Sequence, residues 1–344
     1  MRGGAIDYDA AAKKIRQLGP APPRGTLDAR LLVRLATLAA SNLNSQPWKF
    51  RIERDAITIL PDYARRMQVI DPDDSLLFHS LGCAAENLIL AASAQGFDAD
   101  ASYSPAVDGI VVRLERSAWA KASDLYEAIP LRQCVRKVYD GQPLGRAELA
   151  KLTGIGRGSR AQTVVLIKDA AKETVVELVT QGNALQLTDR AYRRELAAWT
   201  RFNNREALRR GDGRASRALG SLPLPSIPTR FLTKQLFDPE AQSKRDAKQI
   251  RSSAGIAVFV ASEHDKATWI DVGRACQRFA LQAAALDIRT AFINQPIKAP
   301  PLQTQFEQWL QLKGERAMLM LRFGHGPKAR LSLRRPIEQV IVEG

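Results

Sequence analysis

The sequence predicts an α+β protein in which two related halves surround a pair of long central helices. Residues 81–97 align with residues 272–288, and both segments are amphipathic and rich in alanine and glycine. Small residues of this kind let two helix backbones approach closely. Strand-like runs follow each segment, at 99–103 with 110–114 and at 290–293 with 318–322. Two alanine-rich helices could be alike by chance, but the recurring strands favour a duplication.

The composition is that of a soluble globular protein with a sizeable core. The chain has 344 residues, of which 45% are hydrophobic and 25% charged, enough for one large or two ordinary domains. The apolar helical stretch at 88–94 is too short to cross a bilayer, and residues 1–17 lack a secretory apolar run. Cys83, Cys134 and Cys276 show no paired spacing, so we expect a reduced, cytoplasmic protein without a membrane span.

The strong positive charge raises nucleic acid as a partner. The net charge is +15, and clustered cations bind phosphate backbones by releasing counterions. Here, however, the basic residues are spread along the chain, and no helix-turn-helix, zinc-finger or aromatic RNA-binding pattern accompanies them. We therefore expect a solvated basic surface, part of which could attract anionic small molecules.

Several other chemistries lack their sequence patterns. His79, His264 and His325 lie far apart without ligands at metal-binding spacing. The chain also has no nucleophile elbow, no phosphate loop of the Walker type and no dinucleotide-binding glycine fingerprint after a strand. We expect no metal site and no side-chain nucleophile.

The first half is expected over residues 26–117, after an N-terminal extension at 1–25. Apolar spacing predicts a helix at 31–39, and 50–52 with 57–60 read as short strands. Between them lies the string Ser-Asn-Leu-Asn-Ser-Gln-Pro-Trp at 41–48, which places polar side chains where a helix gives way to a strand. Such residues also cap helices and form turns, so a ligand site and a plain turn with a buried Trp48 remain open alternatives.

The second half is expected over residues 123–344. Strands are predicted at 163–167 and 256–260, and helices at 172–187 and 190–202. Residues 205–253 contain glycines, prolines and charges that break regular periodicity. Eight apolar residues argue against disorder there: Leu219, Leu222, Leu224, Ile227, Phe231, Leu232, Leu236 and Phe237. We expect a lid or arm over a ligand cavity, with an oligomer contact as the alternative.

Two basic segments in the second half suit phosphate. Three cations occur within Arg132–Lys137, and the pair Arg334 and Arg335 follows a glycine-rich turn. Arginine donates two charge-assisted hydrogen bonds from a planar fork, which matches phosphate oxygens. On residues alone, an exposed basic turn explains the first segment at least as well, and a solvated tail is the alternative for the second.

Together these segments resemble the nitroreductase superfamily. The string at 40–48 is similar to the family's flavin-contacting motif Pro-Ser-x-x-Asn-x-Gln-Pro-Trp, with Ala40 in place of the proline. Residues 132–136 resemble the family's Arg-x-Ser-x-Arg/Lys element, with Cys134 in place of the hydroxyl residue. The resemblance extends from about Asp28 to Val342 and is nearest to the Acg-like branch, in which two nitroreductase-like halves are fused.

The resemblance implies a nitroreductase-like fold with FMN as cofactor and assigns its ligands. Ser41, Asn42, Asn44 and Gln46 would contact the flavin from the first half. From the second half, Arg132 would bind the phosphate, and Cys134 would contribute less than a hydroxyl. Arg136 would stabilise the reduced ring beside N1 and O2. Asn294 and Gln295 would lie near N5, although they could equally cap a strand end, and Arg334 and Arg335 would complete the phosphate site.

One complete flavin site is expected across the interface of the two halves. The first half carries the polar string without a phosphate element before it, and the second half is the reverse. In dimeric family members each flavin is held by both subunits, so this chain would act as an intrachain pseudo-dimer, alone or as a homodimer. The resemblance implies an FMN-dependent oxidoreductase that passes hydride from NAD(P)H to an electron-poor small molecule in a ping-pong cycle.

Three other functions stay open. A lid-covered flavin site would make a non-enzymatic protein that binds or sequesters FMN. Oxygen-dependent oxidation or flavin fragmentation would use the same cofactor. A nucleic-acid binder would instead show steep salt dependence and no yellow colour.

Overall fold

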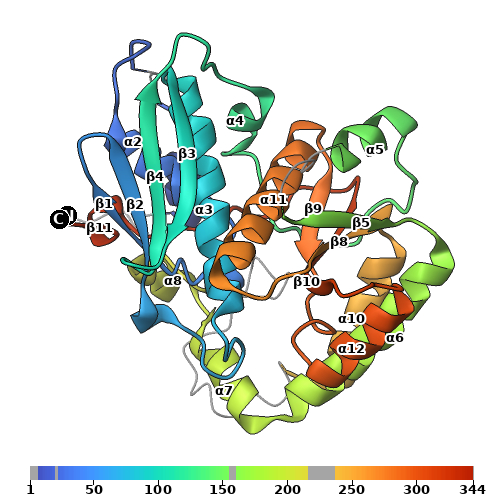
Figure 1. Cartoon of the computed structure of the whole chain (residues 1–344). Coiled ribbons are helices and arrows are strands. Elements are labelled where there is room, and N and C mark those ends of the chain that lie inside the picture. Colours follow the sequence, from blue (N-terminus) through green and yellow to red (C-terminus); the bar gives the residue numbers. More distant parts are fainter. Residues whose placement is uncertain (1–6, 20–21, 155–159, 216–236, 344) are drawn as a thin grey trace.

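The protein has an α+β fold with two separate, mainly antiparallel sheets joined by packed helices (Figure 1). The computed structural model describes residues 7–19, 22–154, 160–215 and 237–343. The helices are α1 Tyr8–Ile15, α2 Ala29–Ala36, α3 Ser75–Ala94, α4 Asp124–Ala128, α5 Arg146–Thr153, α6 Asp169–Thr188, α7 Arg190–Ala198, α8 Asn204–Arg210, α10 Pro239–Arg251, α11 Lys266–Ala285 and α12 Pro300–Trp309. Short 3₁₀ turns are η1 Asn42–Asn44, η2 Tyr63–Arg65 and η4 Ile337–Gln339.

The two sheets repeat one strand order. The first contains β11 Ile341–Val342, β1 Trp48–Ile52, β2 Ala56–Pro61, β4 Gly109–Arg116 and β3 Phe97–Ser104, in that order. The second contains β5 Gln162–Leu166, β8 Gly255–Ala261, β10 Arg316–Gly324 and β9 Arg289–Phe292, in that order. A short pair, β6 Thr200–Arg201 and β7 Arg214–Ala215, stands apart. Sequential numbering therefore gives the pattern 1-2-4-3 in both sheets, and the strands predicted from periodicity are confirmed.

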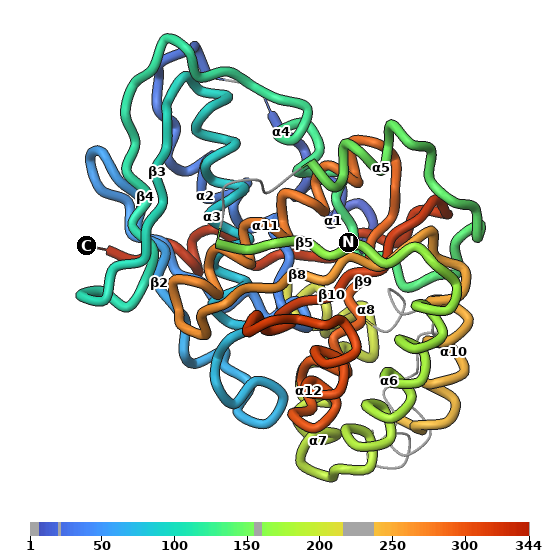
Figure 2. The backbone as a smooth tube through the Cα atoms, turned by 45° about the vertical axis from the view of Figure 1, so that its right-hand side comes forward, coloured from blue at the N-terminus to red at the C-terminus, as the bar shows by residue number. Residues whose placement is uncertain are grey.

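β11 is the exception to this repeat because it crosses from the second half to the first sheet. It pairs with β1 in parallel, with Phe50 opposite Ile341, and the Phe50 N–H donates to the Val340 carbonyl at 2.7 Å. Figure 1 and Figure 2 show the C-terminal end of the chain at the first sheet, on the side of the molecule away from β9. The last part of the chain thus closes an edge that β1 would otherwise expose.

The central helices α3 and α11 cross at two equivalent glycines. A Cβ on Gly82 would lie 2.1 Å from the Ile270 carbonyl oxygen, and one on Gly273 would lie 2.1 Å from that of His79. Under the alignment of the two segments, Gly82 corresponds to Gly273 and His79 to Ile270. Only glycine permits this approach at both points. We propose on this basis, and from the shared strand order, that the halves are related as an internal pseudo-dimer.

The core lies along this crossing. Almost every residue of α3 is buried, and the main apolar cluster runs from α2 and β1 across α3 and α11 to β10. Among the residues that the structure describes, α3 is the one helix long and apolar enough to cross a membrane, but 94% of that window is buried inside the protein. A central core helix meets the same criteria, so this result is weak evidence for a span.

The prediction of an irregular segment at 205–253 is wrong at both ends. α8 occupies 204–210 and α10 occupies 239–251. The Asp238 side chain caps α10 by accepting from the Ala241 N–H at 2.7 Å, and Pro239 stands at the first position of the helix. Because mainly Asp246 and Ile250 are buried in α10, its apolar stripe is too thin for periodicity to detect. The expected helix at 190–202 ends earlier, at Ala198.

The middle of the expected lid lies outside the described residues. This part, 216–236, holds the predicted lid residues Leu219, Leu222, Leu224, Ile227, Phe231, Leu232 and Leu236. Phe237 is described and packs on a small apolar cluster with Met67, Ile70, Leu187 and Leu196.

Candidate functional site

The polar string after α2 forms a tight turn rather than an extended loop. Leu43, Asn44 and Gln46 all have positive φ, at 48°, 57° and 53°. The Ser41 hydroxyl accepts from the Gln46 N–H at 3.1 Å and so fixes the turn. Asparagine tolerates this backbone region better than most residues, which helps to explain the amide residue at 44.

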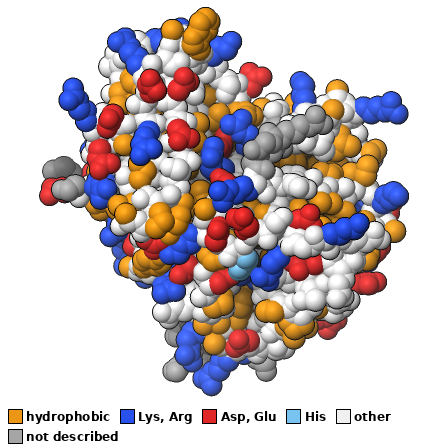
Figure 3. Space-filling view, viewed as in Figure 1, with side chains coloured by type: hydrophobic (Ala, Val, Ile, Leu, Met, Phe, Trp, Pro, Cys, Tyr) orange, Lys and Arg blue, Asp and Glu red, His pale blue; other side chains and the backbone are white. Residues whose placement is uncertain are grey.

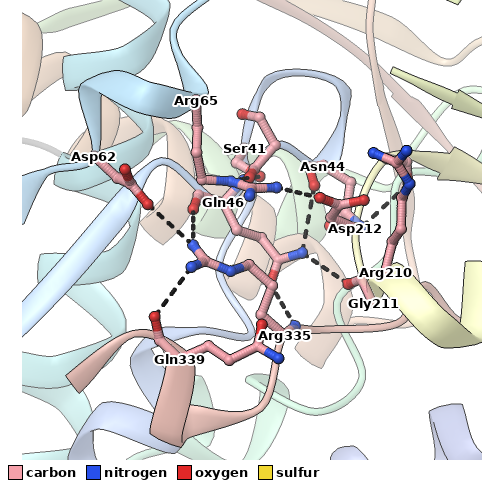
Figure 4. Close-up of polar contacts among 12 residues, drawn as sticks. Ser41, Asn44, Gln46, Asp62, Arg65, Arg210, Gly211, Asp212, Arg335 and Gln339 are labelled. Carbon is pink, nitrogen blue, oxygen red and sulfur yellow. Dashed lines mark hydrogen bonds and ion pairs between the residues drawn. The ribbon is translucent and has the colours of Figure 1, made fainter. Parts of the chain in front are cut away.

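Asn44 and Gln46 bind other parts of the chain (Figure 4). The Asn44 side-chain amide donates to the Gly213 and Leu333 carbonyls at 3.2 and 3.3 Å. The Gln46 amide donates to the Gly211 carbonyl at 2.9 Å, and its oxygen accepts from the Arg335 N–H at 2.9 Å. These two predicted cofactor ligands therefore tie the segment after α8 and the C-terminal segment to the turn.

Arg335 lies in the same network. Its guanidinium donates to the Gln46 carbonyl at 3.2 Å and pairs with the buried Asp62 carboxylate at 3.4 Å. The neighbouring Asp212 pairs with Arg65 and, at 2.8 Å, with Arg201. Arg335 is thus compensated by a carboxylate, unlike the two other arginines predicted to bind phosphate.

Arg132 and Arg334 converge on the carboxyl end of α2. Both guanidinium groups donate to the Leu38 carbonyl, at 3.1 and 3.0 Å. Arg334 also donates to the carbonyls of Thr37 at 2.6 Å and Ala39 at 3.0 Å. The negative end of a helix dipole favours cations, so this position partly offsets the cost of burying the two charges.

This arginine pair fits a phosphate. Arg132 and Arg334 are only 4% and 5% exposed, and neither forms an ion pair with a carboxylate in the described ranges. The Arg132 Nε is buried without a hydrogen-bond partner. Burial lowers the pKa of both guanidinium groups, that of Arg334 strongly. Buried charges are normally paired, and a phosphate dianion has the charge and the acceptor oxygens that would pair with these two groups.

A small pocket lies beside the turn. Its volume is about 60 Å³, and its walls are Ala40, Ser41, Asn42, Leu43, Leu76, His79, Ser80, Cys83, Arg136, Phe292, Asn294 and Leu319. The structure thus brings together four predicted site residues, Ser41, Asn42, Arg136 and Asn294. The Asn294 side-chain oxygen accepts from the Met320 N–H at 2.8 Å, whereas the structure gives the Arg136 guanidinium no hydrogen bond or ion pair among the described residues.

Cys134 lies between the two arginine positions. It forms a single parallel bridge with Thr290 of β9. Burial raises the pKa of its thiol, but the charge of Arg136, a hydrogen bond with the Phe292 backbone and the charges of Arg132 and Arg322 outweigh this and leave the pKa lowered. The segment 132–136 therefore runs from the carboxyl end of α2 to β9, with one arginine at each end.

Gln295 lies away from the pocket. Its amide donates to Asp246 of α10 at 3.1 Å and to Asn183 of α6 at 3.4 Å. Burial raises the pKa of the Asp246 carboxyl. The side chain of Gln295 thus joins α6 and α10, and its neighbour Asn294 alone reaches the pocket.

The sequence interpretation missed the wall that α3 contributes. Leu76, His79, Ser80 and Cys83 have the i, i+3, i+4, i+7 spacing of one helix face. Both His79 ring nitrogens are buried without a partner, and burial lowers the pKa of the imidazole to about 3. The sequence did contain a signal for this wall, because His79 and Ser80 are polar residues on an otherwise apolar helix face.

A second, wider groove lies beyond Leu43. Its volume is about 600 Å³. Five arginines line it, Arg65, Arg66, Arg194, Arg201 and Arg210. Asp212 and Asp74 already pair with three of them. On the face seen in Figure 3, cationic and acidic side chains are likewise interspersed rather than collected into one basic patch.

No protein-family model matches the chain. Two curated Mycobacterium tuberculosis proteins, from strains CDC 1551 and H37Rv and both named "Putative NAD(P)H nitroreductase", are 24% identical over 311 residues, which is 87% of this chain and 85% of theirs. The FMN-dependent nitroreductase NfnB from Mycobacterium smegmatis, solved with NADPH, is 13% identical with a TM-score of 0.43 over 63% of this chain and 96% of its own.

A nitroreductase from Bacteroides fragilis with bound FMN is 13% identical, with a TM-score of 0.38 over 62% of this chain and 94% of its own. Assignment to the Acg-like branch stays a prediction. Along most of its length this chain is therefore similar to the two curated proteins, and its polar turn and arginine segment resemble those of the nitroreductase superfamily.

Proposed function

We propose that this protein is an FMN-dependent oxidoreductase that takes hydride from NAD(P)H and reduces an electron-poor small molecule. The observation that carries the proposal is the buried arginine pair, which has no carboxylate partner among the residues that the structure describes and lies next to a pocket walled by the polar turn. Likeness over 87% of this chain to proteins named for NAD(P)H nitroreduction supports the same activity.

Each part of the site would have a distinct task. Arg132 and Arg334 would exchange carbonyl oxygens for phosphate oxygens, which bind a guanidinium more strongly because they are charged. Ser41, Asn42 and Asn294 would supply hydrogen bonds to the polar edge of a flavin. Arg136, whose guanidinium has no hydrogen bond or ion pair within the described ranges, would stabilise negative charge on that edge. Bound FMN would supply the hydride and electron transfer itself.

The apolar walls would exclude water. Leu43, Leu76, Phe292 and Leu319 surround the polar groups of the pocket. Ligand pockets usually measure about 300 Å³ or more, whereas this one measures about 60 Å³. FMN binding would therefore require the walls to move apart. The turn at Leu43 is one such wall, because Leu43 lines this pocket and also packs on the apolar cluster of Met67, Ile70, Leu187 and Leu196.

The small pocket also favours the second candidate, a protein that binds FMN without turnover. A cavity that closes tightly over the ring would deny access to a nicotinamide donor. The two candidates share the cofactor and differ in whether a second planar molecule can reach it.

One experiment separates these possibilities. The purified chain is incubated with FMN, unbound flavin is removed, and the visible spectrum is followed after anaerobic addition of NADPH or NADH. A bound flavin band that bleaches supports the reductase. A band that persists with both donors favours sequestration, and the absence of any band contradicts both.

A further inference from the structure

We propose that Arg16, from the N-terminal segment, is a third phosphate ligand, so that the site selects a terminal phosphomonoester. This inference rests on the proposed FMN function and deepens it. It predicts that FMN binds more tightly than FAD, whose pyrophosphate is esterified at both ends and so has no terminal phosphate, and more tightly than riboflavin, which has no phosphate at all.

The structure places Arg16 against both other arginines. Its Nη1 donates to the Arg132 carbonyl at 3.1 Å and to the Pro130 carbonyl at 3.0 Å. Its Nη2 donates to the Ser332 hydroxyl at 3.3 Å, and the same hydroxyl accepts from Arg334 at 2.6 Å. Arg16, Arg132 and Arg334 therefore form one cluster, which we call the arginine triad.

The triad is buried without an acid. Arg16 is 5% exposed, and the ion pairs of the described residues include none to Arg16, Arg132 or Arg334. Burial and the charge of Arg132 lower the pKa of Arg16 to about 9. The Nε atoms of Arg16 and Arg132 both lack a hydrogen-bond partner. Three like charges in this setting repel one another and carry unused donors.

The charge count selects the ligand class. A phosphomonoester carries near two negative charges at neutral pH, whereas each phosphate of a diester carries one. Three guanidinium groups with two spare Nε donors match the dianion and its three terminal oxygens. Carbonyl oxygens at the end of α2 now satisfy part of the triad, and phosphate would replace some of them.

The helix α1 holds Arg16 in place. Tyr8 and Ala12 pack on Ala207 of α8 and Leu333. Arg330 stacks over the Tyr8 ring at 3.8 Å. Arg16 follows directly as the residue that ends α1. A segment outside the two expected halves thus delivers a charge to their interface.

The test compares Arg16→Gln with the unaltered protein in affinity for FMN, FAD and riboflavin, measured by flavin fluorescence. We expect the affinity for FMN to fall about tenfold or more, as for loss of a charge-assisted hydrogen bond, while riboflavin changes less than about twofold. Equal losses for FMN and riboflavin would overturn the inference. The inference would also be overturned if the unaltered protein bound FAD as tightly as FMN.

Arg34→Gln is the matched control. The Arg34 guanidinium donates to the carbonyls of Ile15, Gln17 and Leu18, so it anchors the same segment without belonging to the triad. If loosening of α1 alone were responsible, Arg34→Gln would reproduce the effect and contradict the role of Arg16. If Arg16→Gln fails to fold, Arg16→Lys keeps the charge without the fork and should still lower the preference for FMN over riboflavin.

Thermal unfolding with inorganic phosphate separates this inference from the proposed function. At equal ionic strength, phosphate should raise the unfolding temperature of the unaltered protein above that in chloride, and Arg16→Gln should remove the difference. This result would support the triad even if no flavin bound, whereas flavin binding without any phosphate preference would leave the proposed function and refute the triad.

Discussion

At the scale of single residues, His79 shows that a residue of the candidate site can cost the protein stability. Its imidazole sits inside a helix pair with neither nitrogen bonded. Such a group is tolerated in the neutral form, since burial disfavours the charged one. A bound ligand with a polar edge would give the ring nitrogens the partner that the protein does not.

His79 predicts loss of stability in acid. Burial lowers its pKa from 6.5 to about 3, so on acidification the unfolded chain takes up the proton before the folded one. Stability present above pH 6.5 is lost as the pH falls toward 3. Between pH 7.5 and 5 the loss should be about 2 kcal/mol, measured by urea unfolding. The loss of stability in His79→Gln should be smaller than in the unaltered protein. In His264→Gln, which changes a more exposed histidine, most of the loss should remain. An equal loss in His79→Gln would contradict this.

Arg132 predicts a loss specific to the flavin phosphate. If it binds phosphate, Arg132→Ala should weaken FMN binding by about 2 kcal/mol and riboflavin binding by much less. Equilibrium ultrafiltration of each flavin measures both. Arg335→Ala is the comparison, because Arg335 is already paired with Asp62 and should change the two affinities alike. Equal losses in Arg132→Ala would remove its phosphate role.

Among whole elements, the crossing of α3 and α11 has the least freedom. Glu86 and Asn87 of α3 align with Gln277 and Arg278 of α11. Arg278 pairs with Glu86 at 2.5 Å, and at the equivalent place Gln277 donates to Asn87 at 2.7 Å. The two contacts occupy positions that the internal alignment relates, but one is an ion pair and the other is a pair of amide side chains.

Gly82→Ala should destabilise the protein. In an ordinary helix this change stabilises by about 1 kcal/mol, but here the added carbon would meet the Ile270 carbonyl. We expect a loss of about 3 kcal/mol or more in urea unfolding. Ser93→Ala, near the end of α3, should change stability little. Stabilisation by Gly82→Ala would mean that the helices are not in contact at this point.

Strong periodicity made most elements predictable, and weak periodicity hid the rest. The strand β8 is a continuous apolar run bounded by glycine and serine, and it was predicted within a residue or two. α10 was missed because capping rather than an apolar stripe defines it.

At the site, the residue types were predictable and their partners were not. Side-chain chemistry indicated that Asn44 and Gln46 would bind something polar. That they bind the carbonyls of Gly213 and Gly211 depends on a contact between segments far apart in sequence. The lining from α3 was hidden for the same reason, since a helix face does not reveal what lies opposite.

At the scale of the molecule, the first sheet depends on the end of the chain. Val340 is fully buried, and β11 supplies the neighbour of β1. Val340, with the partly buried Ile337 and Ile341, therefore packs on the core of the first half although these residues follow the second half in sequence.

Removal of residues 337–344 should destabilise the first sheet by several kcal/mol, about 2 of which come from burial of Val340, with further loss from the exposed edge of β1. Urea unfolding measures the stability, and size-exclusion chromatography should detect association through the free edge. Removal of 343–344 alone should have little effect. A stable monomer after the longer truncation would show that β11 is dispensable.

The same crossing sets an order of events during synthesis. Ile341 leaves the ribosome 291 residues after Phe50 (341 − 50), which at about 5–20 residues per second takes about 15–60 s. Throughout that interval β1 lacks its β11 partner, and an unpaired edge is a place where other chains can join. Any pause in translation within the second half lengthens this exposure. Because β11 follows β10 in sequence, the first sheet is completed only after all strands of the second sheet have been synthesised.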